Sequence, residues 1–584
     1  MSGKERLYEG LGVAPGIAIG PAHIRETGGL EVPEHKIRKA DVAAERERLG
    51  KAVILAQRQI RRLQSRAKKM SGAAAEELGF LLEAYQQMLT DSRLVRGADT
   101  RITEQRINAE AAVQWGMADI TSTFQAMDDA YIAARLDDIR EVGNRIIRNL
   151  IGKPLPAFSS APKGSVIMTD HLTPADMAQV DPALIAGAAS ALGGIEGHTA
   201  IMARALALPM VLGATDLLHQ LHPGEMVIID GGRGRIIVNP KRRTLAAYQR
   251  RKEALSREIR RLGQLRARSA RSRDGNEYFL QANVDLPMEM PMVADAGAEG
   301  IGLLRSEFMF MNRDHPPRED EQFEILRDIV SAMDGKPVTI RSLDVGADKL
   351  ASSVTGDFAD TAASALGLRG IRLALMQPDI LEAQFRAMLR VATYGPVRIL
   401  LPMVSTISEV QRAREILAKA AKQLKRRKVA LPDPLPPLGV MIEVPGAALA
   451  ADALAQVSDF FAIGSNDLTM YTLATDRANE HVAHLFDPLH PAVLRLIQFA
   501  TGAALRARIP ISICGEMAGD ERYTALLLGL GLRELSMSPA SIPRVKRRIR
   551  AMDAAAATAR ANLIMDQTDS GRIATLLDDF NDTA

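Results

Sequence analysis

Cysteine is almost absent from this chain, because Cys514 is the only one among 584 residues. An internal disulfide is therefore excluded, and the composition suits a reducing compartment. The first residues hold no apolar core of the kind found in signal peptides. No run approaches the ~20 uninterrupted apolar residues of a membrane helix. We therefore expect a cytoplasmic protein that is not inserted in a membrane.

An excess of charge is also missing, since 74 basic and 70 acidic residues leave a formal net charge of +4. That balance gives no strong drive towards nucleic acid or a membrane surface. Hydrophobic residues make up 47% and charged residues 25%, which is ordinary for a globular protein. The chain is too long for one hydrophobic core, so we expect several domains.

Residues 38–150 contain little Pro or Gly, and Ala, Arg, Glu, Leu and Ile recur there at helical spacing. We interpret this block as a helical bundle inserted into an α/β domain formed by residues 1–37 and 151–240. Segments 165–170, 185–190 and 226–239 of that domain are typical of strands bounded by turns. The pattern does not decide whether the bundle is a scaffold or a docking site for another protein.

Residues 241–273 are highly basic and helical in pattern. We interpret them as a solvated linker helix rather than a nucleic-acid-binding segment, because the basic residues are not interleaved with aromatic ones.

Strand and helix signals alternate regularly over residues 274–584, without a short-period repeat. Eight strand–helix units in about 300 residues predict a (β/α)₈ TIM barrel. The eight predicted strands are YFLQAN, GIGLLR, VTIRSLD, RILLPMV, GVMIEV, FFAIGSND, ISICGE and ELSMS.

The ends of these predicted strands are unusually polar, and in a barrel the carboxyl ends of all strands meet on one rim. A lone arginine at a strand end is usually a surface ion pair, but the whole set favours an active site. One arginine guanidinium can donate two hydrogen bonds to the oxygens of a phosphate or carboxylate. Two carboxylates are enough to hold Mg²⁺ when water and substrate supply its other ligands. The set is Asn283, Arg305, Arg341, Asp344, Glu443, Ser465, Asn466, Asp467, Cys514 and Glu516, with Arg369, Arg372 and Arg477 in loops.

The pattern therefore predicts a small, multiply charged anion bound together with a metal at Glu443 and Asp467. Cys514 lies among these groups and is able to transfer a proton. From its position alone, a buried inert thiol is the better interpretation.

A second motif, GGIEGHTAIMARALALPMVLG, places His198 after two glycines and at the start of a predicted helix. The free N–H groups and positive dipole of a helix N-terminus suit a phosphoryl group and keep an imidazole neutral. Most lone histidines are structural, and the chain has ten, so the motif alone leaves a nucleophilic role open.

Specific stretches distributed over the whole length resemble Enzyme I of the phosphoenolpyruvate:sugar phosphotransferase system. Pyruvate phosphate dikinase and phosphoenolpyruvate synthase share the histidine domain and the barrel, but they carry an ATP-grasp domain for which this chain has no room. The stretches include GLGVAPGIAIG, GAEGIGLLRSEFMF, RSLDVGADK, ALGLRGIR, MIEVPGAALAAD, FFAIGSNDLTMYTLATDRANEHVAHLFDPLHPAVLRLI and ISICGEMAGD.

The resemblance implies a multidomain α/β protein: a phosphohistidine domain with an inserted helical bundle, followed by a TIM barrel. It implies autophosphorylation of His198 from phosphoenolpyruvate, release of pyruvate, and transfer to an HPr-type phosphocarrier for sugar uptake or a regulatory relay. It also implies that Cys514 is the proton donor and that the helical insert is the docking site for HPr. The barrel is then the domain through which two copies form a homodimer. The implied substrate-binding residues are Arg305, Arg341, Asn466, Asp467 and Arg477, beside the further candidate Arg369, and the implied Mg²⁺ ligands are Glu443 and Asp467.

Three departures from the family pattern bear on rate and on the identity of the acceptor, although none removes a catalytic group. Ile195, Glu196 and Gly197 replace the usual Arg-Thr-Ser before the histidine. In the stretch where the family usually reads TNDLTQYT, this chain has Ser465 and Met470. The family usually has Asn-Pro before a Leu-Gly-x-Arg motif, whereas Ala363 and Ser364 stand near that motif here.

Two other functions remain as alternatives. A remnant of a dikinase would be labelled from ATP. A regulatory protein would sense phosphoenolpyruvate without turnover, but the intact His198, Cys514 and metal carboxylates argue against it.

Overall fold

The structure is a computed structural model of the chain, which divides into two compact units, Met1–Glu258 and Ile259–Ala584. None of the helices within the described ranges combines the length and apolar character needed to cross a membrane. The structure describes residues 4–25, 32–67, 82, 85–86, 88–90, 92–125, 130–152, 161–177, 179–193, 198–206, 208–218, 221–285, 287–310, 315–345, 366–476 and 481–583.

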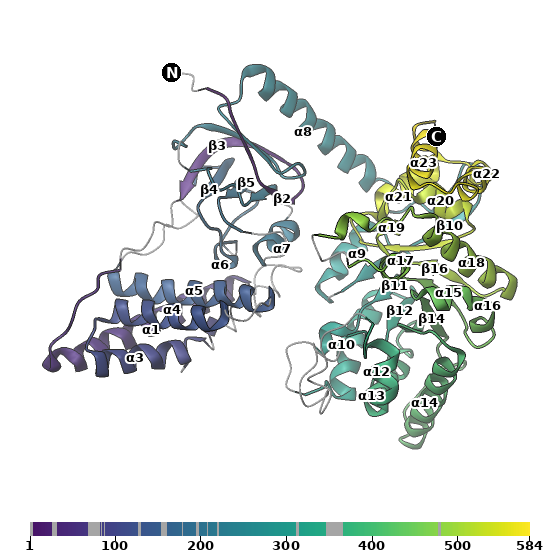
Figure 1. The fold of residues 1–584 in the computed structure, drawn as a ribbon, viewed down its shortest axis with the longest axis horizontal. Helices are drawn as coiled ribbons and strands as arrows, with labels where there is room; N and C mark the ends of the chain where they lie inside the picture. Colours follow the sequence, from purple (N-terminus) through teal and green to yellow (C-terminus); the bar gives the residue numbers. More distant parts are fainter. Residues whose placement is uncertain are drawn as a thin grey trace. The chain divides into compact units, whose positions relative to one another are not determined.

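The first unit contains a mixed eight-stranded sheet with the order β1-β8-β7-β3-β4-β5-β6-β2 (Figure 1). The predicted strands at 165–170, 185–190 and 226–239 are confirmed as β4, β5 and the antiparallel pair β7–β8. The strands are β1 (Arg6–Glu9), β2 (Leu11–Ala14), β3 (Ile17–Arg25), β4 (Ser165–Thr169), β5 (Ile185–Ser190), β6 (Met210–Leu212), β7 (Met226–Asp230) and β8 (Arg235–Val238), with helices α6 (Pro174–Met177) and α7 (His198–Ala205).

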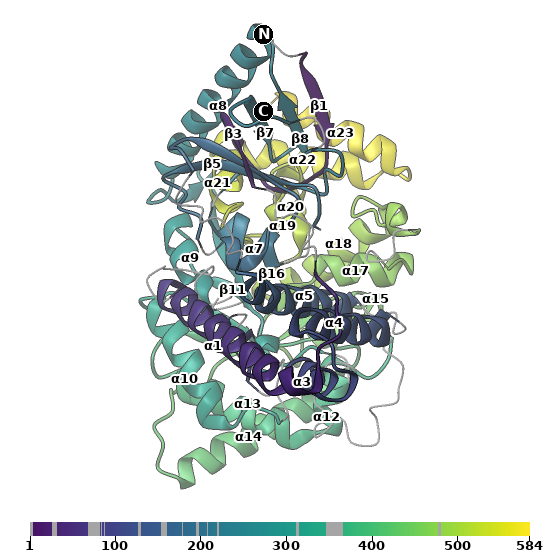
Figure 2. The same ribbon diagram turned by 90° about the vertical axis from the view of Figure 1, so that its left-hand side faces the viewer.

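In the described part of the chain, four longer helices lie between β3 and β4 in the sequence, and they run side by side in Figures 1 and 2. They confirm the predicted helical region. Leu49, Ala56, Ile60 and Leu63 of the first helix are buried at the three-, four- and seven-residue spacing of one helical face. The bundle consists of α1 (Val42–Ala67), α3 (Arg93–Gln105), α4 (Ala109–Gln125) and α5 (Ala130–Ile151), preceded by the 3₁₀ turn η1 (Lys39–Asp41).

Helix α8 (Arg242–Gly263) carries the chain from the first unit into the second. Most of its side chains are exposed, as a solvated basic helix requires. The helix is shorter than the predicted segment 241–273, because Ala270–Arg271 (β9) instead pairs antiparallel with the first barrel strand.

The second unit is a closed barrel of eight parallel strands, and all eight predicted strands are present. Pairing of β10 with both β11 and β17 closes the ring. Leu303, Leu400, Met441, Ala462 and Cys514, contributed by different strands and their ends, form part of one buried cluster. The strands are β10 (Glu277–Val284), β11 (Ile301–Leu304), β12 (Val338–Arg341), β13 (Val397–Leu401), β14 (Leu438–Ile442), β15 (Phe461–Ile463), β16 (Ile511–Ile513) and β17 (Glu534–Met537).

Helices surround this barrel and bury one apolar face each in a common core. They are α9 (Met290–Ala296), α10 (Glu319–Ala332), α12 (Gly370–Met376), α13 (Pro378–Val391), α14 (Ile407–Arg426), α15 (Pro445–Leu449), α16 (Ala451–Leu454), α17 (Ser465–Leu473), α18 (Pro491–Ala507), α19 (Glu516–Gly519), α20 (Thr524–Gly529), α21 (Ile542–Ala551), α22 (Ala554–Met565) and α23 (Ser570–Thr583). Short 3₁₀ turns are η3 (Pro287–Glu289), η4 (Glu307–Met309) and η7 (Ala483–Leu485).

The start of α10 carries an ion-pair network that should make the stability of the barrel depend on pH. Guanidinium nitrogens lie 2.6–2.7 Å from the Glu319 carboxylate, and they belong to Arg386, Arg390 and Arg427. Burial alone would raise the pKa of Glu319, but these three hydrogen-bonding cations outweigh it and lower the pKa from 4.5 to about 2. Because the folded-state pKa is depressed, the stabilisation is present above pH 4.5 and is lost as the pH falls towards 2.

We therefore expect Glu319→Gln to lower the free energy of unfolding by about 1–3 kcal/mol at pH 7, after allowance for solvent screening. The deficit should shrink as the pH falls from 5 to 3. Urea unfolding of both proteins across this range measures it, with the exposed Glu324→Gln on the same helix as control. A deficit that is constant with pH would contradict the prediction.

Candidate active site

Polar side chains gather at the carboxyl ends of the barrel strands, as the alternation of strands and helices predicted. Asn283 is the penultimate residue of β10, Arg341 ends β12, and Arg305, Glu443 and Cys514 directly follow β11, β14 and β16. Asn466 and Asp467 lie in the first turn of α17, because β15 already ends at Ile463. Since the strands are parallel, these residues share one rim.

Arg341 is the buried cation at the centre of this rim. Its Nη2 lies 3.0 Å from Glu307 Oε1 and its Nη1 lies 2.9 Å from Asp344 Oδ2. Burial disfavours the charged guanidinium, but the surrounding carboxylates outweigh burial and raise the pKa of Arg341. Its Nε is buried without a hydrogen-bond partner in the described structure.

Two further arginines are held by carboxylates on the same rim. Arg369 Nη2 lies 3.2 Å from Asp344 Oδ2, so Asp344 joins Arg369 to Arg341. Arg305 Nη1 lies 3.0 Å from Asp285 Oδ2, and both side chains are about half exposed. Guanidinium groups with exposed nitrogens are suited to bind phosphate or carboxylate oxygens.

Glu443 is fully buried, and only one of its oxygens has a partner. The backbone N–H of Met403 donates to Oε1 at 2.6 Å, whereas Oε2 has no hydrogen-bond partner among the described residues. Met403 adopts φ +56°, a left-handed conformation that is rare for a residue with a side chain and aims its N–H at the carboxylate. Burial, together with the charges of Asp344 and Asp467, raises the pKa of Glu443 well above 4.5.

A divalent cation would fit this set of donors. In the described part of the rim, the groups around Arg305, Arg341 and Arg369 include five carboxyl groups, so this cluster has an excess of negative charge when it is fully ionised. Within the described ranges no cluster of three or more His, Cys, Asp or Glu side chains is arranged to hold a metal by itself. A buried carboxylate with one free oxygen beside a second carboxylate instead matches a cation that takes its other ligands from water and substrate.

Cys514 is buried at this rim, as the interpretation from its position expected. Its thiol donates to the carbonyl of Ile463 at 3.5 Å. Burial first, and then the charge of Glu443, raises the pKa of Cys514 to about 12. The thiol therefore keeps its proton at neutral pH, which is the state a proton donor requires.

A cavity of about 730 Å³ opens on the rim and brings Arg305, Asn466 and Cys514 to one surface. Asn466 is fixed there by a pair of hydrogen bonds with Glu516. The backbone N–H of Glu516 donates to Asn466 Oδ1 at 2.9 Å, and Asn466 Nδ2 donates to Glu516 Oε1 at 3.3 Å.

Other predicted site residues are only partly covered by the structure. The backbone of His198 begins helix α7 in the first unit, as the glycine motif predicted. Arg477 and the segment Ile195–Gly197 lie outside the described residues, as do Ala363 and Ser364.

The sequence did not single out Glu307 or Met403. Glu307 follows Arg305 by two residues, so its place just after a strand end was a usable signal. Met403 acts through its backbone N–H, and no side-chain pattern announces such a contact. Both shape the centre of the site, because Glu307 holds Arg341 and Met403 holds Glu443.

Three family models match the chain, and all describe PEP-utilising enzymes. Residues 259–554 match the PEP-binding domain, residues 161–234 the mobile domain and residues 9–135 the N-terminal domain. The first match covers the whole barrel from β9 to β17, including the rim residues described above.

Curated relatives match over nearly the full length. A phosphoenolpyruvate-protein phosphotransferase of Cupriavidus necator is 40% identical over 92% of this chain and 93% of its own. One of Staphylococcus aureus is 35% identical over 98% and 99%. A solution structure of an Enzyme I protein covers 43% of this chain and 99% of its own, with 32% identity and a TM-score of 0.38. This chain is therefore a phosphotransferase that belongs to the PEP-utilising enzyme family, in the branch of the phosphoenolpyruvate-protein phosphotransferases.

Proposed function

We propose that this enzyme takes the phosphoryl group of phosphoenolpyruvate onto His198, releases pyruvate, and passes the phosphoryl group to a histidine of an HPr-type phosphocarrier protein. The pathway served is sugar uptake or a regulatory phosphorelay. The observation that carries the proposal is the convergence, on one barrel rim, of guanidinium groups, a buried carboxylate with a free oxygen, and a protonated thiol.

Each of these groups matches a part of the reaction. The guanidinium groups of Arg305, Arg341 and Arg369, together with Arg477, suit the phosphate and carboxylate of phosphoenolpyruvate. Asn466 and Asp467 stand at the same rim as further substrate contacts. Cys514 offers an S–H group to the carbon that becomes the methyl group of pyruvate.

A ring nitrogen of His198 attacks phosphorus, and the bond between phosphorus and the enol oxygen breaks with its electron pair on that oxygen. The enolate carbon then takes the proton of Cys514, which gives pyruvate and a thiolate that recovers a proton from water. Finally the carrier histidine attacks phosphorus, and the bond to His198 breaks.

Enzymes of this family use a metal. We infer that it is Mg²⁺ and that Glu443 and Asp467 hold it, because hard carboxylate oxygens and an open ligand set suit that ion. When bound, Mg²⁺ would offset negative charge on the phosphoryl group and on the enolate.

Incubation with ³²P-labelled phosphoenolpyruvate, Mg²⁺ and purified HPr-type carriers tests the proposal. We expect acid-labile label on the enzyme first and then on a carrier. Label that reaches the enzyme from ATP but not from phosphoenolpyruvate would favour the dikinase alternative. Tight binding of phosphoenolpyruvate without any label transfer would favour the sensory one.

Glu443→Ala should raise the Mg²⁺ concentration for half-maximal activity by at least ~10-fold, because it removes one of two proposed carboxylate ligands. Initial rates over a Mg²⁺ titration measure the shift. Glu415→Ala on α14 is the matched control, since Glu415 is exposed and is not among the proposed ligands. An unaltered titration would show that Glu443 is structural.

Cys514→Ser should lower kcat for pyruvate formation by about 10²-fold or more with little change in KM. A general acid typically contributes 10²–10⁴-fold, and it acts in the chemical step rather than in binding. Steady-state kinetics with lactate dehydrogenase coupling separate kcat from KM. Unchanged turnover would assign the proton to water or to another group.

The docking site for the carrier and the homodimer are proposed from the resemblance to Enzyme I. The helical bundle is the proposed docking site for the HPr-type carrier, and the barrel unit is the proposed surface of a homodimer. Large exposed apolar side chains on neighbouring helices of the barrel support an interface there; they are Leu449 of α15, and Phe499 and Leu505 of α18. Light scattering of the intact chain, and cross-linking to the carrier, test the two proposals.

A further inference from the structure

A chain of two side-chain hydrogen bonds from separate strands of the barrel ends at the backbone carbonyl of Cys514. Strands β10 and β16 are not neighbours, because β17 lies between them. Even so, Asn283 Nδ2 of β10 donates to the Cys514 carbonyl oxygen at 2.9 Å. In turn, Ser536 Oγ of β17 donates to Asn283 Oδ1 at 2.7 Å. Both polar atoms of the Asn283 amide are thus engaged within the protein.

Local features of the strands make room for this chain of hydrogen bonds. The register between β10 and β11 shifts between Ala282 and Asn283, and such irregularities re-aim side chains next to active sites. On β11, a Cβ added at Gly302 would lie 2.5 Å from Ser536 Oγ. Because that distance is too short for any side chain, Gly302 leaves the space that the serine hydroxyl occupies.

The side of Cys514 that faces β15 is also held in place. Its backbone N–H donates to the Ile463 carbonyl at 3.0 Å, so β15 fixes that side of the strand end. A Cβ added at Gly515 would clash with the hydroxyl of Ser465. A cysteine side chain has a single torsion between backbone and sulfur, so the position of its backbone largely sets where the thiol points.

We propose that Asn283, supported by Ser536, is a positioning residue for proton transfer by Cys514. By holding the Cys514 carbonyl it keeps the thiol over one face of the enolate, so that the S–H bond breaks as a C–H bond forms on that face. This inference rests on the proposed function and deepens it. Both polar atoms of the Asn283 amide are engaged within the protein, so its replacement should disturb proton transfer more than phosphoryl transfer.

The test follows both events in the intact enzyme. In D₂O with (Z)-3-fluorophosphoenolpyruvate and Mg²⁺, delivery of deuterium to one face gives one enantiomer of deuterated fluoropyruvate, which is trapped at once by enzymatic reduction. Asn283→Ala should slow product formation by about 10–10²-fold and should abolish the enantiomeric excess. Single-turnover labelling of His198 from phosphoenolpyruvate should fall by a clearly smaller factor than product formation does.

Variants of Ser536 provide an independent test of the positioning role. Ser536→Ala removes the hydroxyl and should reduce the enantiomeric excess, whereas Ser536→Thr keeps a hydroxyl and should retain it. If Asn283→Ala fails to fold, this pair decides. Retained stereospecificity in the alanine variants, or an equal loss of labelling and protonation, would overturn the inference.

Cys514→Ala distinguishes failure of this inference from failure of the proposed function. If that variant still protonates one face only, Cys514 is not the donor and the proposed mechanism fails. If it loses the enantiomeric excess while Asn283→Ala keeps it, the donor stands and only the positioning role is wrong.

Discussion

His198→Ala should abolish transfer of label from phosphoenolpyruvate to the enzyme and to any carrier, a loss of at least ~10⁴-fold in rate. The physical reason is that the alanine side chain has no nitrogen to attack phosphorus, and His198 is the one proposed acceptor of the phosphoryl group. His198 starts α7, where helix N–H groups and the dipole favour a phosphoryl group. Gel autoradiography after neutral and acid quenching measures the label.

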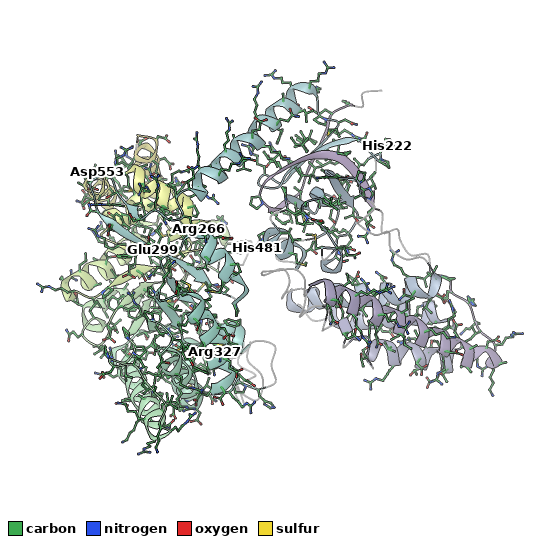
Figure 3. All side chains as sticks on the ribbon, turned by 180° about the vertical axis from the view of Figure 1, so that it is seen from behind. His222, Arg266, Glu299, Arg327, His481 and Asp553 are labelled. Carbon is green, nitrogen blue, oxygen red and sulfur yellow. The ribbon has the colours of Figure 1, made fainter. Side chains whose placement is uncertain are left out.

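His222→Ala is the matched control, because His222 is exposed in the same unit (Figure 3) and lies outside the proposed site. It should label like the unchanged enzyme. Binding of phosphoenolpyruvate should survive in both variants, since the proposed binding groups lie in the barrel. Acid-labile label that persists on the His198 variant would assign the phosphoryl group to a different histidine.

The barrel was predictable because its signals are local. Each strand is an apolar segment bounded by turn residues, and each is followed by a helical pattern, so the count of eight and the parallel order could be inferred. Parallel order then places Arg305, Glu443 and Cys514 on one rim without any knowledge of their distances. The burial of Cys514 was likewise expected from its position beside an apolar strand.

Contacts that cross the barrel were not predictable in the same way. Asn283 and Cys514 are 231 residues apart, and their hydrogen bond depends on the stagger of three strands. The contact between Met403 and Glu443 depends on a left-handed backbone at a residue that is not glycine. Neither stagger nor backbone strain is encoded in the periodicity of side chains, so such contacts emerge only from closure of the barrel.

Arg341→Met should have the largest effect on the barrel, because it keeps the approximate length of the side chain but removes the buried charge. Glu307 and Asp344 would then lose the guanidinium that lies 3.0 and 2.9 Å from them. Breaking a buried pair in this way typically costs about 3–5 kcal/mol. We expect a fall of that order in the free energy of unfolding, measured by urea denaturation.

The effect on catalysis should exceed what lost stability explains, because Arg341 is also a proposed anion-binding group. We expect kcat/KM to stay about 10³-fold or more below the original under conditions in which the variant is still folded. Arg327→Met on α10 is the control. The side chain of Arg327 (Figure 3) pairs with the exposed Asp328 at 2.8 Å and lies over the ring of Phe323, so its loss should change the free energy of unfolding by less than about 1 kcal/mol. If Arg341→Met loses stability yet turns over normally below its unfolding midpoint, then Arg341 holds the rim together without binding the substrate.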